Sequence, residues 1–225
     1  MKPLALALAL AASLGIAACG STKKAGPLGL DQRVPSSADA PRSEPDPVEK
    51  RQTANGPDEF ISRLGDRFVN PTPKDVADFK QSGFVRAIHD TRFFPATPGG
   101  PHTRNAVHIF SLVMQFKSSA GAQKALEFLQ TDSLRPCPRK CSTQIKEFDV
   151  DISDAHGVRR FATAQDIQAT GDEGPPYDSY EIEFADGPFA YRITLHGPPG
   201  KVSQKEVEEI AGKLYDRVAG APPKP

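Results

Sequence analysis

The sequence predicts an α+β domain in which an antiparallel β-sheet of about six strands is covered by helices. Two observations lead to this fold class. Short segments of alternating or continuous apolar residues, which are typical of strands, recur through residues 84–195. Segments with apolar residues at helical spacing stand before, within and after that run. The resulting order is helices, two strands, a helix, four strands and a last helix, as in a sheet with helices packed on it.

Two helices are expected before the first strand. Residues 58–68 place their apolar side chains on one face of a helix, and residues 73–81 form a shorter helix that ends before Gly83. The first strand covers residues 84–94. The next, residues 106–116, has apolar residues on both faces, which predicts a central strand that is covered on both sides.

The second half of the domain is expected to be rich in strands. Residues 118–130 are predicted to form a helix that begins with serine caps. Four antiparallel strands are then expected at residues 143–150, 158–164, 180–184 and 189–195.

The last two of these strands form the clearest pair in the chain. Asp186 and Gly187 are expected at the centre of their hairpin turn. Glu181 or Glu183 is predicted to lie across from Arg192 on the solvent face.

The final helix is expected at residues 202–218. Ser203 and Glu206 form a capping box at its start. Its apolar stripe closes the core of the domain.

The chain divides into four parts by composition. Residues 1–18 read as an export signal, with Lys2 before a short apolar run. Residues 19–57 are rich in proline, serine and charge, which predicts a disordered tether. Residues 58–218 form a single domain, and residues 219–225 a short disordered tail.

The end of the apolar run resembles a bacterial lipobox. Ile16, Ala17 and Ala18 are an aliphatic residue and two small ones, and Cys19 follows them. The resemblance implies that the signal is removed before Cys19 and that the cysteine carries acyl chains such as palmitate. The protein is then held at the cell membrane by its N-terminal lipid and faces the extracytoplasmic side. An ordinary secretory signal is the alternative.

The other two cysteines are Cys137 and Cys141. If Cys19 carries lipid, this pair remains, and it can form a structural disulfide in an oxidising compartment. A zinc site needs further ligands, and a redox motif needs two intervening residues rather than three, so both are disfavoured.

Charge and motifs exclude several classes of function. Lysine plus arginine equals aspartate plus glutamate at 28 each, so no basic footprint for nucleic acid exists. The five histidines lack helical i, i+4 spacing and nearby cysteines, so no metal site is predicted. No serine-hydrolase elbow or phosphate-binding glycine loop is present. We therefore expect neither a cofactor nor an enzyme.

The globular part resembles small actinobacterial lipoproteins. The resemblance rests on the strand that ends at Phe116, the following helix with Ala122, Ala125 and Phe128, and the last helix with Leu214, Tyr215 and Val218. A strand at residues 148–152 followed by His156 and Gly157 belongs to the same pattern. It implies a PsbP/Mog1-like fold, similar also to extracellular sensor domains of bacterial kinases, and a binding role without catalytic residues.

The loops offer the candidate binding residues. Phe93 and Phe94 precede a proline- and glycine-rich loop with His102 and Arg104, and Tyr177 ends another loop. The leading hypothesis is a binding or sensor-like module for a protein partner, an envelope component or a small apolar ligand. An envelope enzyme or enzyme accessory that uses His and Asp residues of the loops is the alternative. A purely structural role in envelope assembly is a third.

Overall fold

The computed structural model describes residues 26–64, 73–103, 106–133, 142–146, 148, 150, 159–166 and 177–224, with the backbone alone for residues 130–133, 142–146 and 159–166. The strands of this part of the chain are β1 (Glu44–Pro45), β2 (Gln52–Asn55), β3 (Phe84–Phe94), β4 (Val107–Phe116), β5 (Ser142–Lys146), β6 (Arg159–Asp166), β7 (Tyr177–Asp186) and β8 (Phe189–Gly197). They form one eight-stranded sheet in the order β1-β3-β4-β8-β7-β6-β5, with β2 also paired to β3.

Every strand pair in this described sheet is antiparallel, which confirms the predicted α+β class. Each of the six predicted strands has a counterpart, and the first of them, residues 84–94, has the expected bounds. The strand expected at residues 143–150 is shorter, because β5 ends at Lys146 and Phe148 and Val150 lie outside any strand. Two short strands, β1 and β2, are added at the edge of β3. They come from the segment that we expected to be a tether.

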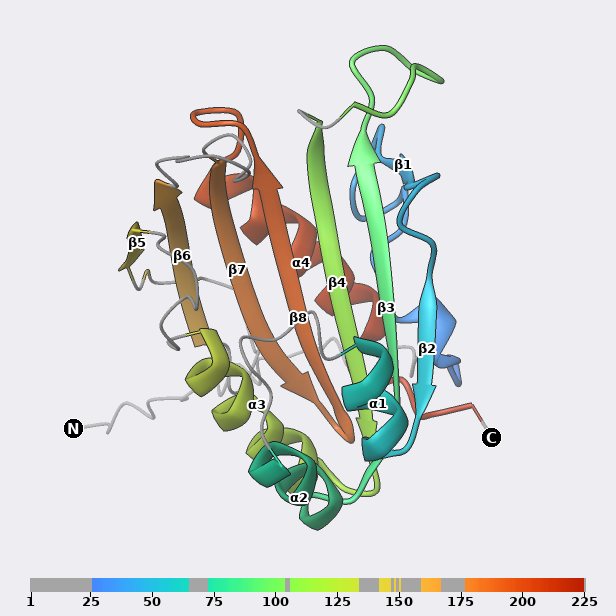
Figure 1. Cartoon of the computed structure of the whole chain (residues 1–225). Helices are drawn as coiled ribbons and strands as arrows, with labels where there is room; N and C mark the ends of the chain where they lie inside the picture. Colours follow the sequence, from blue (N-terminus) through green and yellow to red (C-terminus); the bar gives the residue numbers. More distant parts are fainter. Residues whose placement is uncertain are drawn as a thin grey trace, which may run out of the picture.

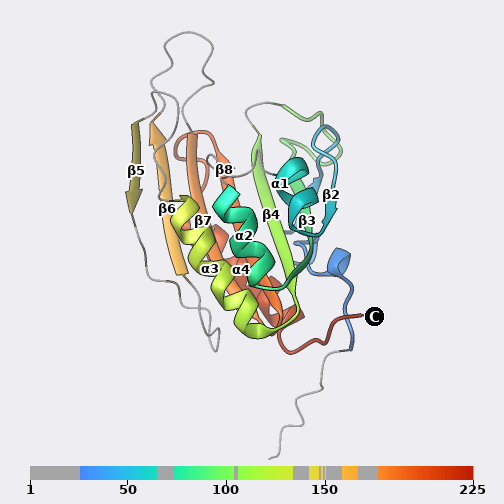
Figure 2. The same cartoon turned by 60° about the horizontal axis from the view of Figure 1, so that its bottom comes forward.

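Helices cover both faces of the sheet (Figures 1 and 2). The described helices are a short 3-10 helix η1 (Leu30–Gln32) and the α-helices α1 (Pro57–Leu64), α2 (Pro73–Gln81), α3 (Ser119–Ser133) and α4 (Gln204–Val218). Figure 2 shows α1, α2 and α3 on one face and α4 behind the sheet. No described helix is long and apolar enough to span a bilayer.

Strand β4 separates two apolar cores, as its two apolar faces predicted. Ile109 and Val113 belong to the core under α4. Met114 and Phe116 belong to the core under α1–α3. Because successive side chains of a strand point to opposite faces, one apolar strand supplies both cores. α4 begins at the predicted cap, where the Ser203 hydroxyl accepts a hydrogen bond from the Glu206 backbone N–H.

The turn of the β7–β8 hairpin lies one residue later than expected. Asp186 still pairs with Phe189, so the two turn residues are Gly187 and Pro188 rather than Asp186 and Gly187. Gly187 has φ +52°, which a residue without Cβ adopts at little cost.

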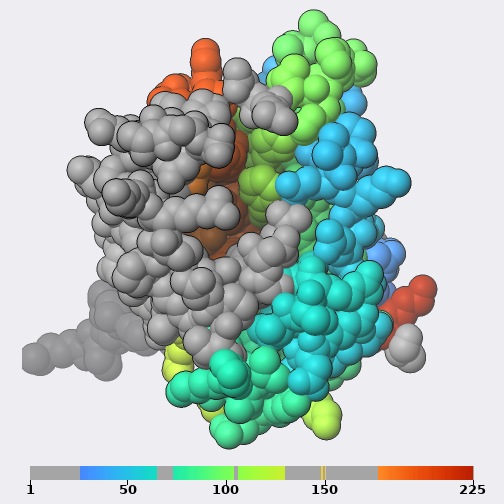
Figure 3. Space-filling view, in the orientation of Figure 1, coloured from blue at the N-terminus to red at the C-terminus, as the bar shows by residue number. Residues whose placement is uncertain are grey.

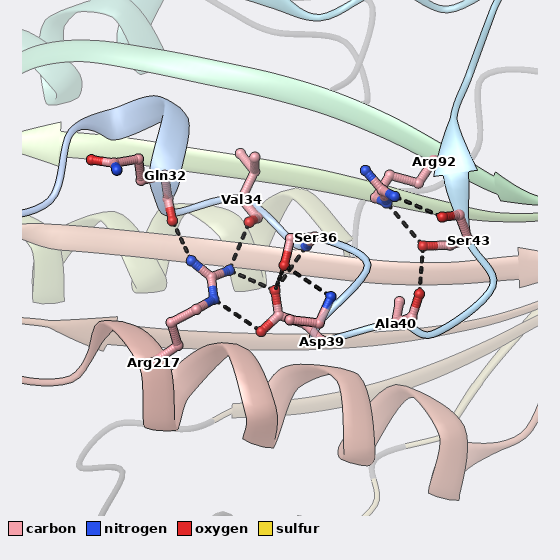
Figure 4. A network of polar contacts seen from close by, with 9 residues as sticks. Gln32, Val34, Ser36, Asp39, Ala40, Ser43, Arg92 and Arg217 are labelled. Atoms are coloured by element: carbon pink, nitrogen blue, oxygen red, sulfur yellow. Dashed lines mark hydrogen bonds and ion pairs between the residues drawn. The ribbon is translucent and has the colours of Figure 1, made fainter.

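The N-terminal segment is docked on the domain, and the expected tether is wrong for residues 26–57. Arg217 on α4 makes two hydrogen bonds to Asp39, at 2.6 and 3.0 Å, and further bonds to the backbone oxygens of Gln32 and Val34 (Figure 4). Arg92 on β3 donates to the Ser43 hydroxyl at 2.8 Å. Polar anchors and strand pairing thus hold a segment that has little apolar periodicity.

Arg33 is the most deeply buried of these anchors. Its side chain is fully buried and lies over the Phe189 ring, 3.7 Å from the centroid. It donates to the Tyr191 hydroxyl at 2.9 Å and to the backbone oxygen of Ala221. A buried cation is stabilised here by hydrogen bonds and by the face of an aromatic ring.

The same contacts correct the expectation of a disordered tail at residues 219–225. Ala221 is buried, and Leu28 pairs with Pro223 in an isolated bridge. The backbone N–H of Leu28 donates to Pro222 at 3.0 Å, and that of Lys224 to Leu28 at 3.1 Å. The two ends of the described chain therefore support each other.

Candidate functional site

The face of the sheet that carries α1–α3 has a polar and aromatic half. Figure 1 shows the described helices of this face over its lower half. Toward the other end of the strands, the side chains of the same face change from apolar to polar and aromatic. They are His89 and Phe93 on β3, His108 and Phe110 on β4, Arg192, Thr194 and His196 on β8, and Tyr177 and Glu181 on β7.

The strand register brings these residues together in rows. His108 lies opposite Phe93 on one side and opposite His196 on the other. In the next row, Phe110 lies opposite Thr194, which lies opposite Glu181. Side chains in one cross-strand row are close neighbours, so residues far apart in the sequence form one surface.

A pocket of about 400 Å³ opens on this surface. The residues that line it are His89, Phe110, Ser111, Leu112, Tyr177, Glu181, Arg192 and Thr194. In Figure 3 a hollow opens on this side of the molecule, with the colours of β4 and of β7 and β8 at its floor. Its size and its mix of aromatic and polar groups are those of a small-molecule site.

A hydrogen-bonded ion cluster forms the polar floor of the pocket. Arg192 Nε lies 2.9 Å from Glu183 Oε1 and 3.4 Å from Glu181 Oε1, and Thr194 donates to Glu181 at 2.9 Å. Arg192 also donates to the backbone oxygen of Leu129 in α3 at 2.8 Å. Glu183 is fully buried, so the predicted pairing is present but its expected place on the solvent face is wrong.

Phe110 and Tyr177 line the pocket, and the His196 ring packs against both of them. Tyr177 lies on His196 with centroids 4.0 Å apart, and Phe110 contacts His196 at 5.8 Å. Burial lowers the pKa of His196 to about 4, with a smaller contribution from His108. The His196 imidazole is therefore neutral at neutral pH and supports the two lining rings without adding a charge.

A cluster of Asp46, His102 and His108 stands next to these rings. His108 is parallel to Phe110, with centroids 5.8 Å apart, and contacts the His102 ring at 5.2 Å. Burial lowers the pKa of His108, although the Asp46 carboxylate opposes the shift. Burial alone would raise the pKa of Asp46, but backbone N–H groups of Glu49 and Val48 and the two imidazoles lower it.

The structure brings three of the five predicted binding residues to this surface. Phe93 contacts His102 edge to face at 5.3 Å, and Tyr177 lines the pocket. Phe94, the next residue of β3, points to the other face of the sheet and packs against the core under α4. Arg104 lies outside the described residues, as do Cys19, Cys137, Cys141 and His156.

Several members of the site were missed from the sequence. Asp46 stands in the segment that was expected to be disordered, and Glu181 and Arg192 were expected to face solvent. His89, His108 and His196 were not combined, because their sequence spacing is irregular. The alternation of side chains along a strand could have identified part of the site. His108 and Phe110 are on the same face of β4 as the apolar residues that precede Phe116, because every second residue of a strand lies on the same face.

A second hollow lies against α4. It measures about 410 Å³ and is lined in part by Arg42, Phe94, Ile210 and Lys213. Under α4 itself the apolar stripe is closely packed, with Leu214 and Val218 fully buried. The helix and the sheet therefore meet in a solid core, and this hollow is a surface groove beside it.

Comparisons with known proteins give likenesses in structure but none in sequence. No family model matches the chain, and no curated protein matches it. The extracellular domain of PknH from Mycobacterium tuberculosis is similar in structure, with a TM-score of 0.48 and 10% sequence identity over 85% of this chain and 92% of that one. At these values the likeness carries no inference about function.

Proposed function

We propose that the protein is a binding module that takes a small, partly aromatic or otherwise apolar ligand in the sheet-face pocket. The observation that carries the proposal is the pocket of about 400 Å³ that combines aromatic walls with a polar floor. Phe110 and Tyr177 offer apolar ring surface to the pocket, and the neutral His196 packs against both rings.

The polar floor of the pocket would orient a bound ligand, while the aromatic side chains would provide most of the binding energy. Glu181, Arg192 and Thr194 already bond to one another, which fixes their side chains before a ligand arrives. Prearranged groups lose less conformational entropy on binding, so a few polar contacts are enough to select a ligand. A flat ligand with one polar group at its edge fits this arrangement.

The proposed location is extracytoplasmic, with the domain held at the cell membrane by lipid on Cys19. The lipobox-like residues 16–19 support this part of the proposal. Because residues 26–57 are docked on the domain, any free tether is confined to the residues before position 26. The domain then stands close to the membrane surface.

The neutral fluorescent probe N-phenyl-1-naphthylamine tests the pocket. Thr194→Phe places an aromatic ring inside the pocket and is expected to weaken probe binding by at least about tenfold, because the probe and the new ring compete for one volume. Val85→Phe adds the same ring at an exposed position of β3 and is the matched control. Equal probe affinity in wild type, Thr194→Phe and Val85→Phe would refute the proposal.

One observation favours the alternative, an envelope enzyme that uses loop His and Asp residues. His102 Nε2 lies 3.2 Å from Asp46 Oδ2, which is the spacing of an aspartate-supported imidazole base. Esterase and phosphatase panels on the full chain test it. Activity that disappears in His102→Ala supports catalysis, and activity that is absent or survives the substitution excludes it.

A further inference from the structure

Three potential metal ligands converge from three separate segments at one end of the sheet. Asp46 follows β1, His102 lies in the β3–β4 loop, and His108 is on β4. Figure 1 shows that loop beside the N-terminal segment at this end of the sheet. Pairing of β1 with β3 places Asp46 there, since its backbone N–H donates to Thr91 at 3.0 Å.

The distances between the ligand atoms fit a tetrahedral ion. Asp46 Oδ2 lies 3.2 Å from His102 Nε2 and 3.3 Å from His108 Nδ1. Zinc–nitrogen and zinc–oxygen bonds of about 2.0–2.1 Å imply about 3.3–3.4 Å between neighbouring tetrahedral ligands, against about 2.8–3.0 Å in an octahedron. All three ligand atoms lie within 4.8 Å of one another.

Two of these atoms are buried and make no well-formed hydrogen bond in the described part of the chain. Within the described part of the chain, neither Asp46 Oδ2 nor His108 Nδ1 has a hydrogen-bond partner, and the Asp46 side chain is fully buried. A buried carboxylate oxygen is costly unless its charge is compensated, and among the described residues the polar atoms beside Asp46 Oδ2 are the two imidazole nitrogens, at 3.2 and 3.3 Å. The two atoms are 3.3 Å apart, so one bound ion would satisfy them together.

The carboxylate is also oriented from behind. Asp46 Oδ1 accepts hydrogen bonds from the backbone N–H groups of Val48, at 2.7 Å, and Glu49, at 2.9 Å. These bonds fix the plane of the carboxylate and leave Oδ2 directed at the two imidazoles. Such support behind a ligand is typical of protein metal sites.

We propose that Asp46, His102 and His108 bind one divalent transition-metal ion of the zinc class. Two imidazoles and one carboxylate suit zinc and exclude calcium and magnesium, which prefer oxygen ligands alone. Three protein ligands leave a fourth position for water or for a donor atom of a bound molecule. The ion joins the N-terminal segment, the β3–β4 loop and the sheet. The proposal does not depend on the proposed function.

Zinc titration of the full chain in detergent, after treatment with a chelator, tests the site. Competition with a chromophoric chelator is expected to give one tight site per chain. Asp46→Asn and His108→Gln each remove a metal ligand. Each is expected to weaken zinc binding by more than about 100-fold, which exceeds the typical effect of losing a residue that only hydrogen-bonds to a ligand. His89→Gln removes an imidazole of the same sheet face and is expected to leave the affinity unchanged.

A second measurement covers the case in which a buried variant fails to fold. His102→Gln changes a loop residue whose side chain is 20% exposed, so its fold is expected to persist while zinc affinity falls. Co²⁺ bound to the wild type is expected to show the intense visible absorption of a tetrahedral site. Absence of a saturable site, a weak octahedral Co²⁺ spectrum, or equal zinc affinity in His102→Gln and His89→Gln would overturn the proposal.

Discussion

Asp39 and Arg217 stand 178 positions apart in the chain and form a two-pronged ion pair that fastens the N-terminal segment to the last helix. The Asp39 side chain is almost fully buried, whereas that of Arg217 is 30% exposed. The Ser36 hydroxyl and backbone N–H both donate to the same carboxylate at 2.8 Å. One acid therefore organises both a turn of the segment and its contact with α4.

Replacement of Asp39 by Asn is expected to destabilise the domain. We expect a loss of about 2–3 kcal/mol in the free energy of unfolding near neutral pH, below the value for a wholly buried pair because Arg217 is partly exposed. Urea unfolding of wild type and Asp39→Asn measures it. Asp31→Asn, at an exposed position of the same segment, is the control.

The same variant has a pH signature. Burial alone would raise the pKa of Asp39, but hydrogen bonds from Arg217 and Ser36 outweigh burial and lower the pKa below its ordinary value of 3.8. A pKa lowered by folding contributes stability that is present above pH 3.8 and is lost as pH falls through the folded value. The difference in the free energy of unfolding between wild type and Asp39→Asn should shrink below pH 3.8. A difference that stays constant in acid would contradict the lowered pKa of Asp39.

The stability contributed by Tyr191 is expected to be lost at alkaline pH, whereas that of Asp39 is lost in acid. Burial raises the pKa of Tyr191 from 10.0 to about 12, although the nearby Arg33 opposes the shift. Folding therefore favours the neutral phenol, and the stability that it contributes is complete below pH 10.0 and lost as pH rises through about 12.

Tyr191→Phe is expected to remove this alkaline loss. Near neutral pH it is expected to cost about 1 kcal/mol, because Arg33 loses a hydrogen-bond acceptor. Thermal unfolding from neutral to alkaline pH compares the wild type with Tyr191→Phe and with Tyr180→Phe, a partly buried tyrosine of β7. If the unfolding temperatures of wild type and Tyr191→Phe fall in parallel as the pH rises, Tyr191 does not control the alkaline stability.

The strands were predictable because their signal is local. Residues 84–94 and 107–116 have apolar patterns that identify β3 and β4 without knowledge of their neighbours. Even the central position of β4 followed from its two apolar faces.

The docked N-terminal segment was not predictable in this way. Its main contacts, from Arg33 to Tyr191 and from Asp39 to Arg217, join residues more than 150 positions apart. Nothing in the local composition distinguishes such anchors from the charges of a solvated tether. Asp46 was missed for the same reason, and with it the cluster that it forms with His102 and His108.

The pocket could not be predicted from the sequence, because its residues come together only through the strand register. Phe110, Thr194 and Glu181 form one row only because β4 pairs with β8 and β8 with β7 at particular residues. A shift of one residue would turn each of these side chains to the opposite face. Sequence reasoning identified the β7–β8 pair but not the place of β4 beside it.

Lipid anchoring predicts the behaviour of Cys19→Ala. Without the acyl chains, about 0.8 kcal/mol per buried methylene is lost, so the variant should leave the membrane fraction or remain as an uncleaved precursor. Membrane fractionation and mass determination of the mature N-terminus measure this. A Cys19→Ala protein that stays membrane-bound and is cut at the same bond contradicts the anchor.

The binding site itself is tested most directly by backbone amide NMR of the protein during titration with N-phenyl-1-naphthylamine. The largest chemical-shift changes are expected on the pocket strands, at Phe110 of β4, Tyr177 of β7 and Thr194 of β8. Ile210 and Lys213, which line the groove beside α4, should change little. Changes confined to Ile210 and Lys213, or no saturable change at Phe110 and Thr194, would contradict the proposed binding site.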